Sequence, residues 1–486
     1  MTIEDYARAD ATELASWVAR GDVKPEELAE TAFRAIERIN PELNAVLQVL
    51  RESALEAISR NLPQGSFRGV PFLIKELVCH AAGVRCEMGS RLSDGYTPSD
   101  DTELMARFRR AGLVLVGTTQ TPEFGYNPTT ETVRFGPVHN PWNPGHSAGG
   151  SSGGSGAAVA AGLVPLAHAN DGGGSIRIPA SCNGLVGLKP TRDRIPSGPD
   201  LGDLLYGLAT EFAVSRSVRD SAALLDAVAG PDVGAPGLIA PPPRPYLEEV
   251  GRDPGTLRIA FTSQSPSGRA VDSDCADAVA LTVKHLEALG HELVEAAPPL
   301  DWESFLDDTH ILWTAFSAHS VDGTAALLGR KASPENLEAV TWACVEEGRR
   351  YSAGDLTRAL DGVNRVSREV GAFFAGIDVL ITPTMARPPV PLGEVDQNAA
   401  GLSARAWTQQ VFEYCAFTPL FNTTGQPALS LPLHEGRDHL PIGVQCVGRF
   451  GDESSLFRLA GQLETSLPWK DRTPQLHVTR DVEGAR

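Results

Sequence analysis

The sequence of 486 residues has few basic side chains, no paired cysteine motif and no long apolar run. Lysine and arginine number 42 against 61 aspartates and glutamates, which gives a net charge of −19 at pH 7. A chain this acidic repels nucleic acids and anionic membrane surfaces, so we expect neither as a partner. No stretch reaches the roughly 18 consecutive apolar residues that span a bilayer. Residues 1–21 are charged throughout and lack the apolar core of a secretory signal, so we expect no membrane insertion and no secretion.

The cysteines form no Cys-x-x-Cys pair and no Cys/His metal spacing. There are seven of them: Cys79, Cys86, Cys182, Cys275, Cys344, Cys415 and Cys446. An odd, scattered set favours reduced thiols over disulfides or metal ligands. We therefore expect a cytoplasmic protein without a structural metal.

Apolar runs alternate with amphipathic helical patterns along most of the chain. Strand-like runs lie at 69–77, 112–124, 257–265, 291–297, 377–391, 426–433 and 440–449, and the run at 377–391 continues into prolines. Helical patterns lie at 11–20, 25–39, 101–112, 274–290 and 453–464. This alternation predicts an α/β protein with buried strands.

Two further segments bear on the organisation of the chain. Pro25 opens the second N-terminal helix and Asn40-Pro41 is predicted to end it, and we expect both N-terminal helices to pack outside the core. The proline-rich stretch 229–250 is consistent either with an inter-domain linker or with a surface crossover.

A glycine-rich stretch, GHSAGGSSGGSGAAVAAG at 145–162, contains four serines. Ser147 fits the G-x-S-x-G nucleophile elbow, but the preceding HNPWNPGH favours an irregular loop over the strand that an elbow requires. The stretch also lacks the G-K-[ST] ending of a phosphate-binding loop. Ser147 is therefore a weak candidate nucleophile, and we expect Ser152 and Ser155 to form local hydrogen bonds.

A second cluster places three glycines directly before Ser175, in DGGGSIRIPASCNGLVGLKPT. Successive backbone N–H groups can converge there without interference from Cβ atoms, as an oxyanion hole requires. Asp171 and Arg177 flank the serine, and they either pair to hold the loop rigid or are solvated. Lys75 follows three apolar letters in FLIKEL, where burial would lower its pKa and make it a neutral base.

These motifs together resemble the amidase signature family. The resemblance rests on the spacing of GVPFLIKEL, GGSSGGSGAAVAAG and the Ser175 segment, with further matches at NPWNPG, ITPT and FNTTGQPALSLPL, and it spans nearly the whole chain. It implies one domain over 1–486 with a mixed, twisted central sheet covered by helices on both faces. The implied parts are a helical segment at 1–60, a signature core at 67–195, a helical, pocket-lining region at 196–375, and C-terminal strands and a helix at 376–470.

The resemblance also implies a catalytic apparatus. Ser175 would be the nucleophile, Ser151 a bridging serine that follows a cis peptide bond, and Lys75 the terminal base. The oxyanion would be stabilised by the backbone N–H groups of Gly172, Gly173, Gly174 and Ser175. The implied enzyme is a serine amidohydrolase that cleaves small or oligomeric amides, and also carbamates and esters, through an acyl-enzyme. It needs no cofactor and no metal, and works as a monomer or homodimer.

Two other functions remain open at this point. One is a partner-dependent role like that of the A subunit of tRNA-dependent amidotransferases. The other is an α/β-hydrolase esterase that uses Ser147. The acidic composition and the full-length resemblance to stand-alone hydrolases favour the amidohydrolase.

Within the family the chain resembles the nylon-oligomer hydrolases, through PLAHAND, RIPAS and LPWKDRTPQL. Where those enzymes have a cysteine near the substrate, an ungapped match puts Trp313, and where they have a pocket asparagine it puts Tyr126, beside Asn127. The resemblance also places Gly149 at the substrate. Two aromatic replacements predict a flatter or aryl-containing substrate, although Trp313 is equally consistent with a core residue of a helix.

Overall fold

One mixed sheet runs through the centre of the protein, for which a computed structural model describes residues 1–480. Within that range its eleven strands follow the order β1-β3-β2-β6-β8-β7-β12-β13-β11-β9-β10. The strands are β1 Val46–Val49, β2 Pro71–Lys75, β3 Val114–Thr119, β6 Leu166–Asp171, β7 Val186–Lys189, β8 Thr210–Ser215, β9 Arg258–Phe261, β10 Glu292–Glu295, β11 Val379–Pro383, β12 Ala428–Glu435 and β13 Pro441–Gly448. A separate hairpin pairs β4 (Glu131–Thr132) with β5 (Gly136–Pro137).

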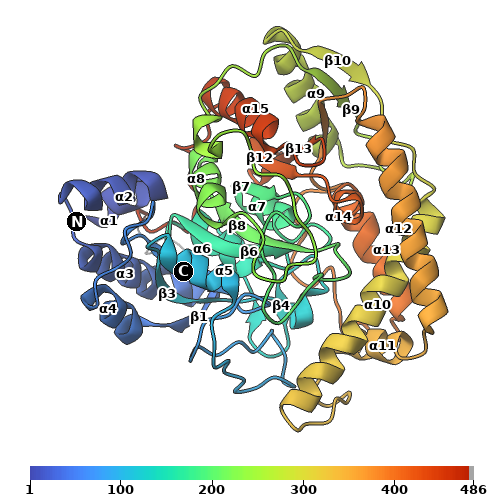
Figure 1. Cartoon of the computed structure of the whole chain (residues 1–486), viewed down its shortest axis with the longest axis horizontal. Helices are drawn as coiled ribbons and strands as arrows, with labels where there is room; N and C mark the ends of the chain where they lie inside the picture. Colours follow the sequence, from blue (N-terminus) through green and yellow to red (C-terminus); the bar gives the residue numbers. More distant parts are fainter. Residues whose placement is uncertain (481–486) are drawn as a thin grey trace.

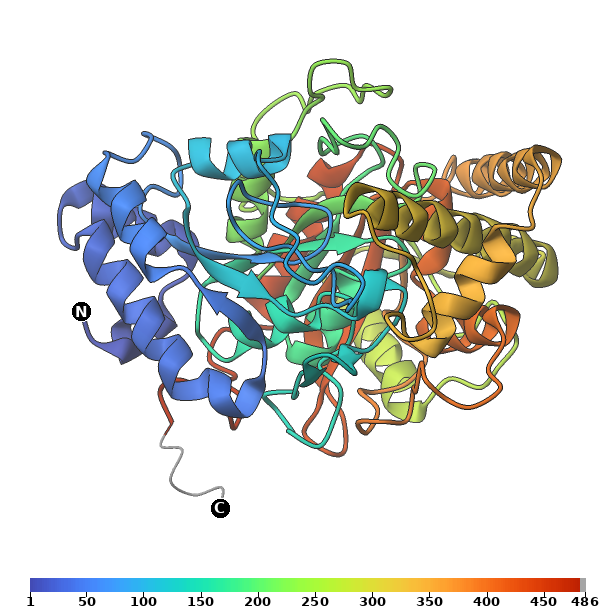
Figure 2. The same cartoon turned by 90° about the horizontal axis from the view of Figure 1, so that it is seen from below.

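The sheet mixes strand directions. β2 is parallel to β3 and β6, whereas β8 runs antiparallel between β6 and β7. β9 is parallel to β10 and β11, while β12 and β13 are antiparallel to their neighbours. Figure 2 shows the twisted sheet with helices on both sides of it. The predicted α/β fold with a mixed central sheet and helices on both faces is confirmed.

Fifteen α-helices surround the sheet in the described residues. They are α1 Ile3–Arg8, α2 Ala11–Arg20, α3 Pro25–Leu43, α4 Arg51–Ser59, α5 Glu103–Arg110, α6 Gly153–Ala160, α7 Arg177–Asn183, α8 Val218–Val228, α9 Ser273–Ala288, α10 Trp302–Leu327, α11 Ala339–Gly348, α12 Ala353–Phe373, α13 Ala404–Cys415, α14 Pro419–Thr424 and α15 Glu453–Ser466, with 3₁₀ turns η1 Glu123–Gly125 and η2 Tyr246–Glu248. Helices α1–α4 gather at one end of the molecule, and α10–α13 at the other (Figure 1).

The N-terminal helices differ from the prediction in two ways. Asp10 caps α2, and α3 continues through Pro41 to Leu43, beyond the end predicted at Asn40-Pro41. Leu43 and Phe33 are fully buried in the main core, so these helices do not pack outside it. The buried apolar face offsets the missing hydrogen bond at Pro41, and the helix ends instead at Asn44, which has a left-handed φ of 54°.

Four of the eleven strands of the sheet were not predicted, and neither was the β4–β5 hairpin. β6 and β7, which lie on either side of the Ser175 segment, are two of the four. β1 lies inside the expected helical segment 1–60 and pairs with β3, and β8 lies inside the expected helical region 196–375 between β6 and β7. The stretch 229–250 leads from α8, which follows β8, to β9 of the same sheet, so it is a surface crossover.

Helix α6 explains the glycine-rich stretch. All eight of its residues are buried, and a Cβ on Gly154 would lie 2.6 Å from the backbone N of Gln120. Only glycine allows the helix to approach β3 this closely. The glycines therefore let the backbone of α6, which follows Ser151 in the chain, pack directly against the backbone at the end of β3.

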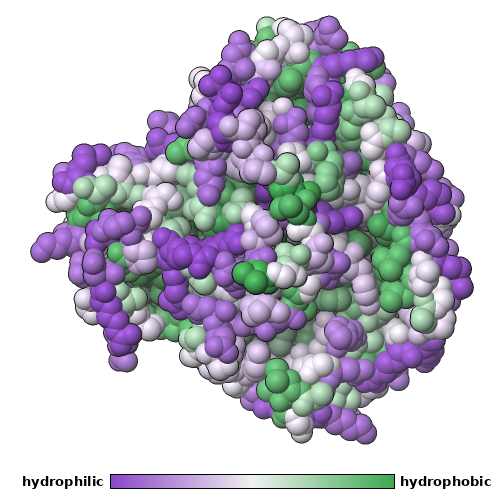
Figure 3. Space-filling view, in the orientation of Figure 1, coloured by the Kyte–Doolittle hydropathy of each residue, from purple (hydrophilic) through white to green (hydrophobic). Residues whose placement is uncertain are grey.

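No helix in residues 1–480 is both long enough and apolar enough to cross a bilayer. On the face shown in Figure 3, apolar residues form separate patches among charged ones.

Candidate active site

Lys75 ends β2 and is completely buried. Its Nζ lies 2.7 Å from Ser151 Oγ, 3.0 Å from Ser152 Oγ and 2.6 Å from Asn170 Oδ1. In the neutral form the amine keeps two N–H donors and one lone pair, so it can accept one proton from a hydroxyl. Asn170 accepts a hydrogen bond from the amine through Oδ1, and its NH2 group donates to the carbonyl of Leu77 at 3.0 Å. The serine hydroxyls are therefore the groups that can give the amine a proton.

Burial lowers the pKa of Lys75 from 10.5 to about 7. The carboxylates of Glu211 and Asp171 act in the opposite direction and raise this pKa, but they offset burial only in part. A substantial fraction of the amine is therefore unprotonated at neutral pH, which gives Lys75 the properties of a base.

Ser151 follows a residue whose backbone packs closely against a second backbone segment. The peptide bond between Gly150 and Ser151 is cis, as the family resemblance implies. A Cβ on Gly150 would lie 2.4 Å from the carbonyl oxygen of Thr129, so the loop accepts only glycine there. Close packing thus holds the Ser151 hydroxyl beside Lys75.

Ser175 follows β6 and precedes α7. It is 8% exposed, lines the cavity, and within residues 1–480 its hydroxyl has no hydrogen-bond partner. The backbone N–H groups of Gly172, Gly173 and Ser175 likewise have no partner in the described residues. Gly174 differs, because its N–H donates to Asp171 Oδ1 at 2.7 Å. The free donors near the serine are therefore those of Gly172, Gly173 and Ser175, and Gly174 shapes the loop instead.

Asp171 and Arg177 form a fully buried ion pair. Arg177 Nε donates to Asp171 Oδ2 and a terminal nitrogen donates to Oδ1, both at 2.9 Å. Arg177 also donates to the carbonyl of Thr418 at 3.0 Å and to Gln445 at 2.7 Å. Although burial alone would raise the pKa of Asp171, the Arg177 charge and hydrogen bonds hold it at about 2. The pair ties the Ser175 loop to α14 and β13, as the rigid-loop alternative predicts.

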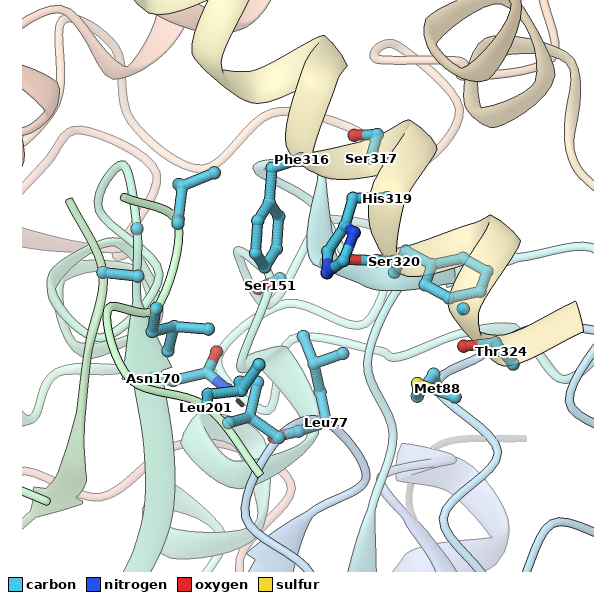
Figure 4. A pocket seen from close by; sticks show the side chains of 18 of the residues that line it. Leu77, Met88, Ser151, Asn170, Leu201, Phe316, Ser317, His319, Ser320 and Thr324 are labelled. Atoms are coloured by element: carbon cyan, nitrogen blue, oxygen red, sulfur yellow. Dashed lines mark hydrogen bonds between the residues drawn. The ribbon is translucent and has the colours of Figure 1, made fainter. Parts of the chain in front are cut away.

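A cavity of about 490 Å³ opens above Ser151 and Ser175. Its wall is mainly apolar, and the apolar side chains that line it are Leu77, Val78, Met88, Phe124, Leu201, Leu204, Leu205, Trp313, Phe316 and Leu327. In Figure 4, Phe316 and His319 reach from α10 into the cavity, opposite Ser151, Asn170 and Leu77. The cavity fits a small molecule with an apolar body.

Of the expected substrate-binding residues, Trp313 lines the cavity and the other three do not. The Tyr126 ring stacks behind the Trp313 ring, with centroids 4.4 Å apart, and its hydroxyl bonds to Thr408. Asn127 is buried and bonds to Gln397 and Thr129. Gly149 packs against Cys182 and accepts a hydrogen bond from Thr130. Tyr126 thus supports Trp313 and does not itself reach the cavity.

The remaining serines have other roles. Ser147 is fully buried, its hydroxyl accepts the N–H of Gly149 at 3.0 Å, and it lies in a loop without the strand and helix of an elbow. Ser155 donates to the carbonyl of His168. Neither serine forms the local hydrogen bond that was expected, because the partner of Ser155 is 13 positions away and Ser152 contacts Lys75.

Sequence reasoning missed Ser152 and Asn170 as partners of Lys75, and also the buried pair of His168 and Glu211. The available signal was the strand period, since His168 and Asn170 are two residues apart on β6 and therefore point to one face. Among residues 1–480, no group of three or more His, Cys, Asp and Glu side chains is arranged to hold a metal ion.

The fold is of the α/β class and the candidate site is built from serines around a buried lysine, and comparisons with known proteins give the family of the chain. The amidase family model matches residues 27–457, so the chain belongs to the amidase family. It is 40% identical over 477 residues to 6-aminohexanoate-cyclic-dimer hydrolase of Paenarthrobacter ureafaciens, covering 96% of each chain. It is 39% identical over 477 residues, again 96% of each chain, to the protein of that name from a Pseudomonas species.

Solved structures agree with this assignment. The structure of a 6-aminohexanoate cyclic dimer hydrolase superposes with a TM-score of 0.92 at 38% identity, covering 97% of this chain and 99% of the other. The chain is thus a hydrolase that acts on amide C–N bonds, in the amidase signature family.

Proposed function

We propose that this enzyme hydrolyses small, uncharged amides through Ser175, Ser151 and Lys75. The observation that carries the proposal is the 2.7 Å contact between the buried Lys75 Nζ and Ser151 Oγ, beneath a cavity that Ser175 also lines. A serine hydroxyl is a weak nucleophile and needs a base, and a buried lysine near its pKa can supply one.

The first half of the reaction forms the acyl-enzyme. Ser175 Oγ attacks the carbonyl carbon and its proton passes to Ser151 Oγ, while the proton of Ser151 moves to Lys75 Nζ. The electron pair of the C=O bond moves onto oxygen, which the N–H groups of Gly172, Gly173 and Ser175 stabilise. When the intermediate collapses, the C–N bond breaks, and Lys75 returns its proton through Ser151 to the leaving amine.

The second half repeats these steps with water. Water attacks the ester carbonyl and gives one proton to the relay, the C–O bond to Ser175 breaks, and the proton returns to Ser175. The carboxylic acid then leaves. Carbamates and esters would enter the same cycle, because they present the same acyl carbon.

The relatives named for cyclic 6-aminohexanoate dimers suggest nylon-oligomer-like amides as one substrate class. The aromatic wall formed by Trp313 and Phe316 favours compact or aryl groups, because flat rings stack well there. We also propose a cytoplasmic monomer or homodimer, and the seven buried, unpaired cysteines support a reducing compartment.

The test of the function is hydrolysis by the purified chain alone, assayed against alkyl, aryl and cyclic amides and carbamates. Release of amine and acid without a partner is the expected result. An enzyme that hydrolyses amides only after a second protein is added would contradict the proposal and favour the amidotransferase-like alternative.

The pH dependence should report Lys75. The pKa of this lysine lies at about 7, and the reactive form is the neutral amine. We therefore expect kcat/KM to fall tenfold per pH unit below about pH 7 and to level off above it. Rates of a neutral amide from pH 5 to 9 measure this, and a profile flat down to pH 5 would rule out an amine base with this pKa.

Selectivity should depend on Trp313. In Trp313→Cys we expect the ratio of kcat/KM for an aryl amide to that for the cyclic dimer to fall about 10-fold, since one packed aromatic contact is lost. Tyr126→Asn should move the ratio less, because Tyr126 only supports the Trp313 ring. Trp302→Cys, on the same helix but outside the cavity, is the matched control. Equal ratios in Trp313→Cys and Trp302→Cys would mean that Trp313 does not contact substrate.

A further inference from the structure

A buried carboxylate lies behind the candidate base, and the mechanism above does not use it. Glu211 on β8 is 2% exposed and forms an ion pair or hydrogen bond with His168 Nε2. Asn170 and Glu211 are cross-strand partners, so their side chains lie on one face of the sheet, together with His168. That face also holds the amine of Lys75, through its contact with Asn170.

The proton positions in this group follow from the hydrogen bonds. The backbone N–H of Lys75 donates to His168 Nδ1 at 3.2 Å, so Nδ1 carries no proton. The ring proton is then on Nε2 and is donated to Glu211 Oε2. Glu211 thus accepts a hydrogen bond from a neutral imidazole, so that with Glu211 ionised the pair has a net charge of −1.

This negative charge is incompletely compensated. The second carboxylate oxygen of Glu211, Oε1, is buried and has no hydrogen-bond partner in the described residues. The ring of Phe108 packs edge-on against His168, with centroids 6.1 Å apart, and adds no charge. An uncompensated buried carboxylate stabilises a nearby cation, and the Lys75 ammonium group is such a cation.

Other titratable or charged groups surround the pair. Asp171 also acts on Lys75, but Arg177 neutralises it. The thiols near Glu211 have raised pKa values because they are buried, so they are uncharged. The charge of Glu211 acts on Cys79 and Cys86, and that of Glu76 acts on Cys86. Arg192, Asp193 and Asp203 line a small cavity together with Glu211, and there the charge of Arg192 interacts with the two aspartates.

We propose that Glu211, oriented by His168, is a positioning residue whose buried charge keeps Lys75 basic enough to accept a proton from Ser151. The proposal rests on the proposed function, in which Lys75 is the base. Burial alone makes the amine a poor proton acceptor, and the carboxylate restores part of its basicity. His168 contributes by holding the carboxylate and the end of β2 in one hydrogen-bonded unit.

The experiment compares pH profiles of kcat/KM for a neutral amide in wild type, Glu211→Gln, Glu211→Met and Glu211→Asp. Both neutral variants should shift the acid limb to lower pH by on the order of one unit, because the ammonium form loses its counter-charge. Their plateau rates should fall a few-fold, since a weaker base accepts the proton less readily. Glu211→Asp retains the charge and should keep the limb near the wild-type position.

Two controls separate this effect from general damage. Glu453→Gln changes a different buried carboxylate, one paired with Arg194, and should not shift the limb. Thermal unfolding of each variant checks that it is folded. A folded Glu211→Gln or Glu211→Met enzyme with an unshifted acid limb overturns the inference, and so does an equal shift in Glu453→Gln.

Lys75→Met, assayed in parallel, distinguishes a failure of the proposed function from a failure of the role proposed for Glu211. If this variant keeps wild-type activity, the proposed function itself fails. If it is inactive while the limb of Glu211→Gln is unshifted, only the role of Glu211 fails.

Discussion

Ser175→Ala is expected to lower kcat/KM for amides by roughly 10⁴- to 10⁶-fold, which is the range for removing a serine nucleophile. The physical reason is that Ser175 lines the cavity and its own loop supplies N–H donors that have no partner within residues 1–480, those of Gly172, Gly173 and Ser175. The same variant should lose covalent labelling by a fluorophosphonate, measured by mass spectrometry of the intact protein.

The control for this variant is Ser147→Ala. Its hydroxyl is buried and bonded to the backbone of Gly149, away from the cavity, so labelling and turnover should persist. If Ser147→Ala loses the label while Ser175→Ala keeps it, the nucleophile assignment is wrong and the elbow alternative is favoured.

Lys75→Met is expected to lower kcat by roughly 10³-fold or more, because the variant keeps the buried volume but has no base to receive the proton of Ser151. The protein should remain folded, since an apolar side chain of similar length replaces a buried amine. Circular dichroism and thermal unfolding check the fold, and the steady-state rate of amide hydrolysis checks the chemistry.

The chain offers a matched control for this lysine. Lys189, at the end of β7, is also buried and also has its pKa lowered to about 7, chiefly by burial, but its amine bonds to the carbonyl of Pro190. Lys189→Met should therefore retain at least about a tenth of the wild-type rate. Equal losses of rate in the two variants would indicate that replacing any buried lysine beside this sheet impairs the enzyme, and that Lys75 is not a specific base.

The candidate site was predictable where its residues belong to short, distinctive motifs. Lys75 follows three apolar residues, and Ser175 follows three glycines, so local sequence indicates both burial and free N–H groups. The pair of Asp171 and Arg177 was also predictable, because the two residues are only six positions apart in the sequence. These features depend on neighbours in sequence.

The wall of the cavity was predictable only in part. Tyr126 and Trp313 were both expected to contact substrate, but the rings stack, and only Trp313 faces the cavity. Which of two stacked rings lies in front depends on how α10 packs against the loop that holds Tyr126. That packing joins residues almost 190 positions apart, and no local pattern encodes it.

The sequence by itself determined the alternation of helices and strands over much of the chain, its acidic character, and the positions of the candidate nucleophile and base. Tertiary structure alone decided that β8 lies between β6 and β7, which places Glu211 beside His168. It also decided that the N–H of Gly174 is bonded to Asp171. The reason is that strand order, register and the direction of each N–H group are set by long-range packing and hydrogen bonding. Apolar runs and glycine content, by contrast, are properties of short stretches of the sequence.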